Sequence, residues 1–306
     1  MINLVTNRRW FFLISAIIIV PGLVCLAIFG LNLGIDFSSG TAMTLHFDRQ
    51  VQISELRQEM SQLGHDEAVI QDAGSGDFFI RLREITADEN QALITGLETG
   101  LNTKITESSF YSVSPVIVQG TVRNTGIAVI ATIVGILLYL AWAFRRMPNP
   151  VRWGTCAVAA LAHDILVVIP LFSILGLVAG VEIDASFVTG LLAVVGISVN
   201  NIVVVFDRIR ANLKRGTGGS FEAAVNSGIN ESIVRSLNTG LATLFVILAL
   251  YLLGGATIKN LVLVLLAGIV TGIYSSICIA GQLLVTWDKI SLRGLFGRRQ
   301  SAGQSV

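Results

Sequence analysis

Two adjacent amides, Asn200 and Asn201, stand late in an apolar run that ends in the charged residues Asp207 and Arg208. A polar side chain at membrane depth costs free energy unless it is paired or hydrated, so it usually faces a bundle interior or a water-filled path. An amide can bridge helices by hydrogen bonds, but it does not change its protonation state near neutral pH. We therefore expect Asn201 to bind or pack and not to carry a proton.

Two further groups place polar side chains in or beside apolar runs. Asp164 follows His163 near the middle of one run, where a lone carboxylate usually has a function or a partner. Arg235 precedes Asn238 and Thr239 by about one helical turn, so these three residues predict a polar stripe that leads inward from the arginine. The alternative interpretation of Arg235 is an arginine that anchors a helix at the membrane surface.

The elements that position these residues are membrane helices. Apolar residues make up 53% of the chain and charged residues 13%, which is typical of integral membrane proteins. A helix that spans a bilayer needs about 20 mostly apolar residues. Six segments meet this requirement: Trp10–Gly30, Gly126–Phe144, Gly154–Val181, Ser186–Phe206, Leu237–Leu253 and Leu261–Val285. The first is too long for a signal peptide and no Ala-x-Ala cleavage site follows it, so we expect an uncleaved helix.

A polar region between the first two spans, residues 31–120, predicts a small soluble domain. It carries 13 acidic and 5 basic side chains, which indicates a solvated acidic body without a nucleic-acid signature. Ser54 and Thr86 are the expected caps of its two helices. The alternating and helical patterns predict the strand and helix order of a ferredoxin-like α+β fold. The segments are Thr41–Phe47, Ile53–Leu63, Ala68–Gln71, Phe78–Leu82, Ala87–Leu101 and Thr106–Ser114.

The basic residues predict the orientation in the membrane. They cluster beside the segments that lie inside if the N-terminus is cytoplasmic, so both termini are expected in the cytoplasm and residues 31–120 outside it. The chain then divides into residues 1–30 with the first span, the domain at 31–120, a bundle at 121–288 and a basic tail at 289–306. Within the bundle, 211–236 has an amphipathic part from Phe221 towards Arg235, which predicts a cytoplasmic interfacial helix before the fifth span.

The sequence gives no support for catalysis or for a bound metal or cofactor. Ser198 and His163 lack the flanking glycine pattern of a hydrolase nucleophile, so we expect no enzyme activity. The three cysteines lie far apart in predicted spans and are expected to pack as small apolar residues: Cys25, Cys156 and Cys278. Small residues recur every fourth position on the last span and predict a helix-packing seam: Gly268, Gly272, Ser276 and Ala280.

Five segments together resemble the SecF family, subunits of the bacterial preprotein translocase and half-size relatives of the RND superfamily. They are Gly34–Gly40 with Asp36, Ala162–Asp164, Glu182–Asp184, Gly196–Arg210 and Glu231–Thr239. The resemblance implies a multi-pass protein of the bacterial cytoplasmic (inner) membrane that pairs with SecD and associates with the SecYEG channel, with YajC as a further candidate. It also implies that the outer domains bind the emerging preprotein and move in cycles driven by proton or sodium flow.

The chain departs from the family pattern at two positions. The resemblance implies a proton-carrying aspartate at position 201, working with the arginine at 235, whereas this chain has Asn201. If ions still cross this half, Asp164 or a carboxylate of the partner must replace the missing one. Ser39 stands in place of a family glycine and suggests an ordinary backbone conformation there. Glu182 and Asp184 are expected to be solvated turn residues.

Three functional hypotheses follow. The first is a SecF-type subunit that uses the proton or sodium motive force, since a six-helix chain with the layout of one RND half implies a second half. The second is a structural partner of SecD that has no ion-coupling carboxylate of its own. The third is a stand-alone RND-like exporter, which would need a pocket of aromatic and polar groups in the outer domain that the sequence does not indicate.

Overall fold

The computed structural model describes residues 3–74, 76–147, 149–216, 219–255 and 258–289 of the 306-residue chain. The contacts divide the chain into two compact units. The helical unit is built from described residues within 1–32, 128–181 and 186–306, and the sheet unit from residues 33–127 and 182–185. The predicted basic tail at 289–306 lies, from residue 290 onward, outside the described residues.

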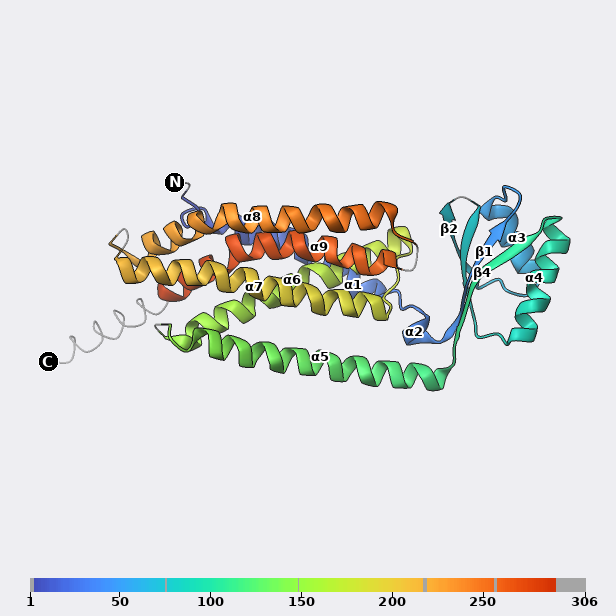
Figure 1. Cartoon of the computed structure of the whole chain (residues 1–306), viewed down its shortest axis with the longest axis horizontal. Helices are drawn as coiled ribbons and strands as arrows, with labels where there is room; N and C mark the ends of the chain where they lie inside the picture. Colours follow the sequence, from blue (N-terminus) through green and yellow to red (C-terminus); the bar gives the residue numbers. More distant parts are fainter. Residues whose placement is uncertain (1–2, 75, 148, 217–218, 256–257, 290–306) are drawn as a thin grey trace. The chain divides into compact units, whose positions relative to one another are not determined.

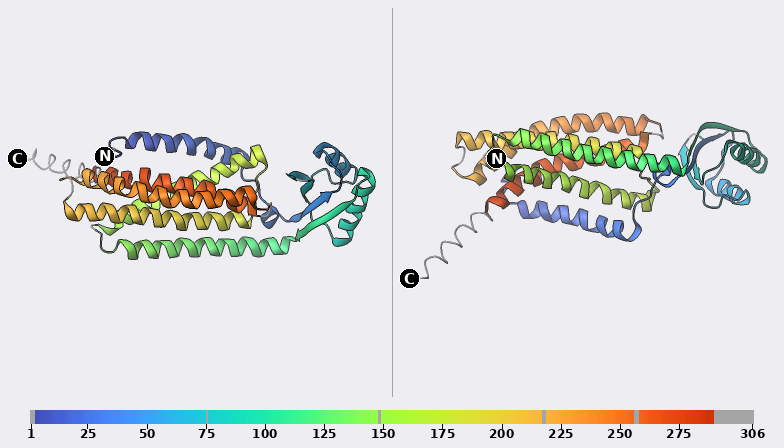
Figure 2. Two further views of the ribbon diagram at one scale, coloured as in Figure 1. Left: turned by 45° about the horizontal axis from the view of Figure 1, so that its top comes forward. Right: turned by 90° about the horizontal axis from the view of Figure 1, so that it is seen from below.

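Among the described residues, six helical stretches are long and apolar enough to cross a membrane, which confirms the six predicted spans. They are α1 (Arg8–Phe29), α5 (Pro115–Phe144), α6 (Pro150–Ala179), α7 (Ala185–Arg215), α8 (Phe221–Leu253) and Lys259–Lys289, which begins with α9 (Lys259–Ser275). After α9 the chain continues through a π-helical segment, η2 (Ser276–Ala280), and stays helical to residue 289. In the helical unit α1 packs on α6, and α9 packs on both α6 and α8 (Figure 1, Figure 2).

Two helix boundaries differ from the predictions. α5 begins at Pro115 and not at Gly126, because a polar first stretch lowers hydropathy without preventing a helix, and proline is favoured at a helix start. The helix predicted from Phe221 towards Arg235 is present as the first part of α8, which runs without a break from Phe221 to Leu253, and residues 211–215 belong to α7. This part of α8 packs inside the unit, where a Cβ on Gly228 would lie 2.7 Å from the Ile209 Cα.

The sheet unit contains the short helix α2 (Ile35–Ser38) and a four-stranded sheet with two helices. Its remaining elements are β1 (Gly40–Phe47), α3 (Ile53–Gln62), β2 (Val69–Gly74), β3 (Asp77–Leu82), α4 (Ala87–Leu101) and β4 (Ile105–Val113). The strand order is β2-β3-β1-β4 and all pairs are antiparallel, which is the ferredoxin-like arrangement that the sequence predicts. Figure 1 shows α3 and α4 on one face of this sheet.

The core of the sheet unit lies between that face and the two helices. Met43 and Leu45 of β1, Leu56 of α3 and Leu97 of α4 are all fully buried in it. Every second residue of β3 is buried, which is the alternation expected of a strand with one covered face.

The two predicted helix caps have different outcomes. Thr86 caps α4 through a reciprocal capping box with Glu89, as predicted. The hydrogen bonds from Thr86 hold the pKa of Glu89 below its ordinary value. The cap predicted at Ser54 is wrong, because α3 begins at Ile53 and already contains Ser54, and its cap residue is Gln52, which makes no side-chain capping bond.

The prediction of ordinary backbone at Ser39 is also wrong. Ser39 ends α2 with φ 60° and ψ 164°, a region that is occupied almost only by glycine. The next residue, Gly40, has φ 134°, and a Cβ there would lie 2.7 Å from the Leu82 carbonyl oxygen. The chain therefore needs two successive glycine-like conformations to pass from α2 into β1.

Candidate functional site

The centre of α6 carries the most deeply buried charged residue of the helical unit. Asp164 is 1% exposed. Its helix buries one continuous face, and Ala157, Ala160 and Val168 share that face with it. In the sequence, Asp164 is the sole Asp, Glu, Lys or Arg within the six predicted spans. A carboxyl group at such a position requires a chemical explanation, because lipid and apolar side chains do not compensate its charge.

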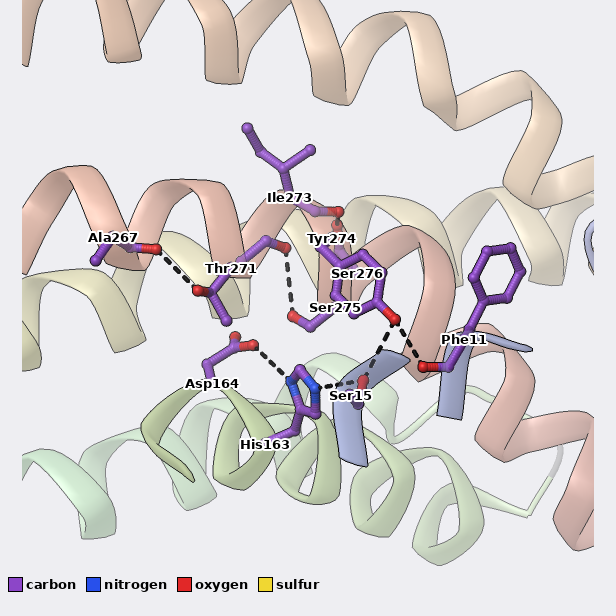
Figure 3. Close-up of polar contacts among 11 residues, drawn as sticks. Phe11, Ser15, His163, Asp164, Ala267, Thr271, Ile273, Tyr274, Ser275 and Ser276 are labelled. Atoms are coloured by element: carbon purple, nitrogen blue, oxygen red, sulfur yellow. Dashed lines mark hydrogen bonds and ion pairs between the residues drawn. The ribbon is translucent and has the colours of Figure 1, made fainter. Parts of the chain in front are cut away.

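A chain of hydrogen bonds leads from Asp164 across three helices (Figure 3). His163 Nδ1 lies 3.3 Å from Asp164 Oδ1, and His163 Nε2 lies 2.9 Å from the Ser15 hydroxyl of α1. That hydroxyl lies 3.3 Å from the Tyr274 hydroxyl of α9, which donates to the Phe11 carbonyl at 2.8 Å. We call His163, Asp164, Ser15 and Tyr274 the polar network.

The α9 side of the network is lined by small hydroxyl residues. Thr271 donates to the Ala267 carbonyl at 2.8 Å, and Ser276 donates to the Ile273 carbonyl at 3.0 Å. The π-helical segment η2 begins at Ser276, two residues after Tyr274. Single π-turns inside helices occur often at functional sites, because they change the direction of the side chains that follow.

Two buried oxygen atoms near this region make no hydrogen bond to any described residue. They are Asp164 Oδ2 and the hydroxyl oxygen of Ser198 on α7. Ser198 is 1% exposed and lies directly against Gly272 of α9. Gly268 packs in the same way against Val194 of α7. These contacts confirm that the stripe of small residues on α9 is a packing seam, and they place it against α7.

The other predicted site residues of α7 and α8 lie at the surface of the helical unit. Asn200 is exposed and Asn201 is half-buried, and Arg235, Asn238 and Thr239 are exposed. Within the described part of the chain, none of these five side chains makes a hydrogen bond or ion pair. The structure therefore separates the predicted set into a buried acid, Asp164, and a group of surface residues.

Asn200 lies in a groove between α5 and α7. The groove has a volume of about 260 Å³ and is lined by Gly135, Ile136, Tyr139, Gly196, Val199 and Asn200. Both glycines leave open space beside the backbone, since a Cβ on either would meet nothing within 4 Å. The groove is apolar apart from the amide and the tyrosine hydroxyl.

Two of the three family-motif residues, Asp36 and Asp207, have local structural contacts. Asp36 Oδ2 accepts a hydrogen bond of 2.9 Å from the backbone N–H of Ala185, the first residue of α7. A carboxylate at that place satisfies one of the free N–H groups of a helix start and complements its dipole. Asp207 is exposed and lies 3.8 Å from Arg210, and Arg208 is exposed at the same end of α7.

Glu182 forms a second buried polar contact, in the sheet unit. Its carboxylate lies 2.9 Å from the Arg81 guanidinium, and the two side chains are 11% and 17% exposed. Arg81 also donates to the Leu33 carbonyl at 2.8 Å, and the Gly34 N–H donates to the Ile183 carbonyl at 2.8 Å. The prediction that Glu182 is a solvated turn residue is therefore wrong. Burial raises the pKa of Glu182, and Arg81 acts in the opposite direction.

Sequence reasoning missed Ser15 and Tyr274, and it considered Ser198 only as a hydrolase nucleophile and not as a buried hydroxyl group without a hydrogen-bond partner among the described residues. Each is a polar side chain inside an apolar span, and that property was visible in the sequence. Serine and tyrosine nevertheless occur in membrane helices with their hydroxyls bonded locally, so their types alone did not indicate a network.

Ser15, His163 and Asp164 stand in the order of a hydrolase triad, but the surroundings argue against hydrolysis. Ser15 lies inside the regular helix α1 and is 6% exposed, so the backbone N–H groups around it are used by the helix and none is free to stabilise an oxyanion. Among the described residues there is also no group of three or more His, Cys, Asp or Glu that could hold a metal ion.

Comparisons with known proteins all find similarity to protein export membrane proteins. The family described as "Protein export membrane protein SecD/SecF, C-terminal" matches residues 94–290, and the family "SecD/SecF GG Motif" matches residues 26–51. The SecF translocase subunit of Thermobaculum terrenum is 44% identical over 98% of both chains. That of Anaerolinea thermophila is 37% identical over 97% of this chain and 98% of its own.

Longer relatives contain a region that is similar to this chain. The SecDF translocase subunit of Bacillus subtilis is 29% identical over 94% of this chain, which covers 38% of its length. A crystal structure of SecDF from Thermus thermophilus, described as a translocon-associated membrane protein, has a TM-score of 0.83 and 31% identity. It matches 94% of this chain and 39% of its own, so this chain spans about two fifths of such fused proteins.

Proposed function

The chain belongs to the SecD/SecF family of protein export membrane proteins, and we propose that it works as the SecF-type half of a two-part export machine in the bacterial inner membrane. The observation that carries this proposal is the match to SecDF. Nearly the whole chain aligns with two fifths of that protein, which leaves room in it for a second, larger half. Where the halves are not fused, a separate SecD chain is the natural partner.

The surface of the helical unit supports a partner in the membrane. Asn200, Arg235, Asn238 and Thr239 are exposed on helices whose other exposed side chains are mostly apolar. Lipid tails offer no hydrogen bonds, so such residues favour contact with another protein or with water inside a complex. The groove beside Asn200 offers open space over two glycines, where a partner helix can approach closely.

In this proposal the sheet unit lies outside the cytoplasm and both termini lie inside, as the basic residues indicate. The sheet unit contacts the preprotein as it leaves the SecYEG channel, and YajC is a further candidate subunit. Proton or sodium flow through the paired membrane halves drives the movement. The family membership and the acidic, solvated sheet unit support this assignment.

Gentle affinity purification of the tagged chain from native membranes tests the pairing. Recovery of SecD and SecY is the expected result, and recovery of the chain only with itself would favour the stand-alone exporter. Arg235→Gln is expected to lower the yield of SecD, because it removes an exposed charge from the proposed contact surface. Arg215→Gln, at the cytoplasmic end of α7, is the matched control and should leave the yield unchanged.

The amide at position 201 favours a second candidate function. Asn201 cannot carry a proton, so this half would stabilise SecD while ions pass through the partner. Asn201→Asp tests this alternative by restoring a carboxylate, with Asn201→Gln as the control that keeps the amide. A change in the pH dependence of gradient-driven export in the aspartate variant alone would show that position 201 lies on an ion path. Identical pH profiles would leave this position with a structural role.

A further inference from the structure

We infer that His163 and Asp164 form a proton-binding site inside this chain, and that Ser15 transmits its occupancy to the contact between α1 and α9. The inference rests on the proposed function, because it assigns ion coupling to a residue of this half although position 201 holds an amide. It concerns a place different from the surface group on α7 and α8.

The surroundings of Asp164 contain few groups that could compensate its charge, so binding or loss of a proton there strongly changes the local electrostatics. The described parts of α1, α7 and α9 beside it contribute no acidic or basic side chain within the apolar spans. The other groups able to titrate there are His163 on α6 itself, Tyr274 on α9, Cys278 in η2 and Cys25 on α1. None of them is a permanent cation, so the charge on Asp164 is neutralised by a proton and not by a fixed counterion.

The hydrogen-bond directions give the network two states. Tyr274 donates its hydrogen to the Phe11 carbonyl, so towards Ser15 it only accepts. Ser15 has one hydrogen, and it points either to Tyr274 or to His163 Nε2. The state of His163 decides which of the two bonds forms.

With a proton bound, the pair of His163 and Asp164 has a net charge of zero. Nε2–H donates to Ser15, Ser15 donates to Tyr274, and the second proton is shared between Nδ1 and Asp164 Oδ1. When this proton leaves to water, the pair carries one negative charge. Nδ1–H then donates to the carboxylate, Nε2 accepts from Ser15, and the bond between Ser15 and Tyr274 loses its hydrogen. One proton therefore makes or breaks a link between α1 and α9.

Two further observations agree with this mechanism. Asp164 Oδ2 has no hydrogen-bond partner among the described residues, and an unpaired oxygen is more costly on a carboxylate than on a neutral acid. The link ends at Tyr274, two residues before the π-helical segment η2 begins at Ser276, where the hydrogen-bond pattern of the helix changes. A change at Tyr274 thus acts where α9 is least regular.

Infrared spectroscopy of the purified full chain in lipid bilayers tests the site directly. The difference spectrum between the unaltered protein and Asp164→Asn should contain the carbonyl band of one protonated carboxylic acid, and this band should appear and disappear as the pH is changed. The control Asp66→Asn removes an exposed carboxyl group of the sheet unit and should leave the band assigned to Asp164 in place. His163→Gln should keep the band and change its dependence on pH. A difference spectrum without such a band, or with a band that does not change with pH, would overturn the inference.

Export into inverted membrane vesicles tests whether the proton is used. Asp164→Asn should abolish the stimulation of export by a proton gradient and leave the ATP-driven part intact, while Asp66→Asn changes neither. Full stimulation in the Asp164 variant would refute coupling at this site and leave the proposed function standing. If the unaltered protein shows no stimulation, the proposed function fails, and the infrared titration still decides whether the site binds a proton. Asp164→Glu keeps an acid there and should retain a band with a shifted midpoint.

Discussion

Replacing Ser39 by glycine should stabilise the sheet unit. Ser39 holds φ 60° and ψ 164° at the end of α2, and its hydroxyl makes no hydrogen bond to a described residue. The substitution therefore removes a Cβ from a strained backbone position without removing a contact. Serine-to-glycine changes at ordinary positions act in the opposite direction, because glycine gains freedom in the unfolded chain.

The size of the effect follows from two opposing terms. A non-glycine residue in this backbone region is strained by about 1–3 kcal/mol, which Ser39→Gly releases. The additional entropy of the unfolded chain costs about 0.4–1 kcal/mol. The expected net change is a stabilisation of about 0.5–2 kcal/mol.

Amide hydrogen exchange of the full chain in detergent or bilayers measures this change locally. The free energy of opening should rise for β1 and β3, which follow and flank the junction at Ser39. Ser54→Gly is the matched control, since Ser54 is exposed in the regular helix α3 of the same unit and should cost about 0.5 kcal/mol. If Ser39→Gly lowers the opening free energy as Ser54→Gly does, the argument from backbone strain is refuted.

Three other substitutions follow from the contacts. Arg81→Ala should destabilise the sheet unit by about 3–5 kcal/mol, because it leaves the Glu182 carboxylate buried without its cation. Burial raises the pKa of Glu182, so the folded state binds a proton at this carboxyl group more tightly than the unfolded state does. The free energy of unfolding should therefore fall as the pH rises above about 4.3. The fall should be steeper in Arg81→Ala, because the cation that lowers this pKa is absent. Gly228→Ala should cost about 1–3 kcal/mol in the helical unit, whereas Gly154→Ala, with open space around it, should be neutral or stabilising. Thr86→Ala should cost about 0.5–2 kcal/mol through loss of the capping box.

Thermal and denaturant unfolding measure these changes, with each control in the same unit. Arg83→Ala is the control for the first, because Arg83 is 70% exposed and lies 3.8 Å from Glu67. Equal losses for the two arginine variants would contradict the buried ion pair. A neutral Gly228→Ala would show that α7 and α8 are not in close contact. The Thr86 argument fails if amide protection at the start of α4 is unchanged.

Local patterns in the sequence predicted the elements of this protein. The six spans follow from long apolar runs, and the ferredoxin-like order follows from alternating and helical periodicities, because both depend on neighbours close in the chain. The cap at Thr86 was predictable for the same reason, since its partner Glu89 stands three residues away. The boundaries of α5 and α8 were not predictable from the sequence, because hydropathy shows which part of a helix is apolar and not where the helix begins.

Only the tertiary structure decided which polar residues meet. Ser15 and His163 are 148 positions apart, and Ser15 and Tyr274 are 259 apart, so no local pattern connects them. The ion pair of Arg81 with Glu182 and the backbone of Ser39 likewise depend on how distant segments pack. The sequence alone identified Asp164 as the carboxyl group that needs a partner, because a charge is costly at membrane depth. Its partner His163 is the preceding residue, and the packing of α1 and α9 against α6 determined that this histidine is linked to the hydroxyl groups of Ser15 and Tyr274.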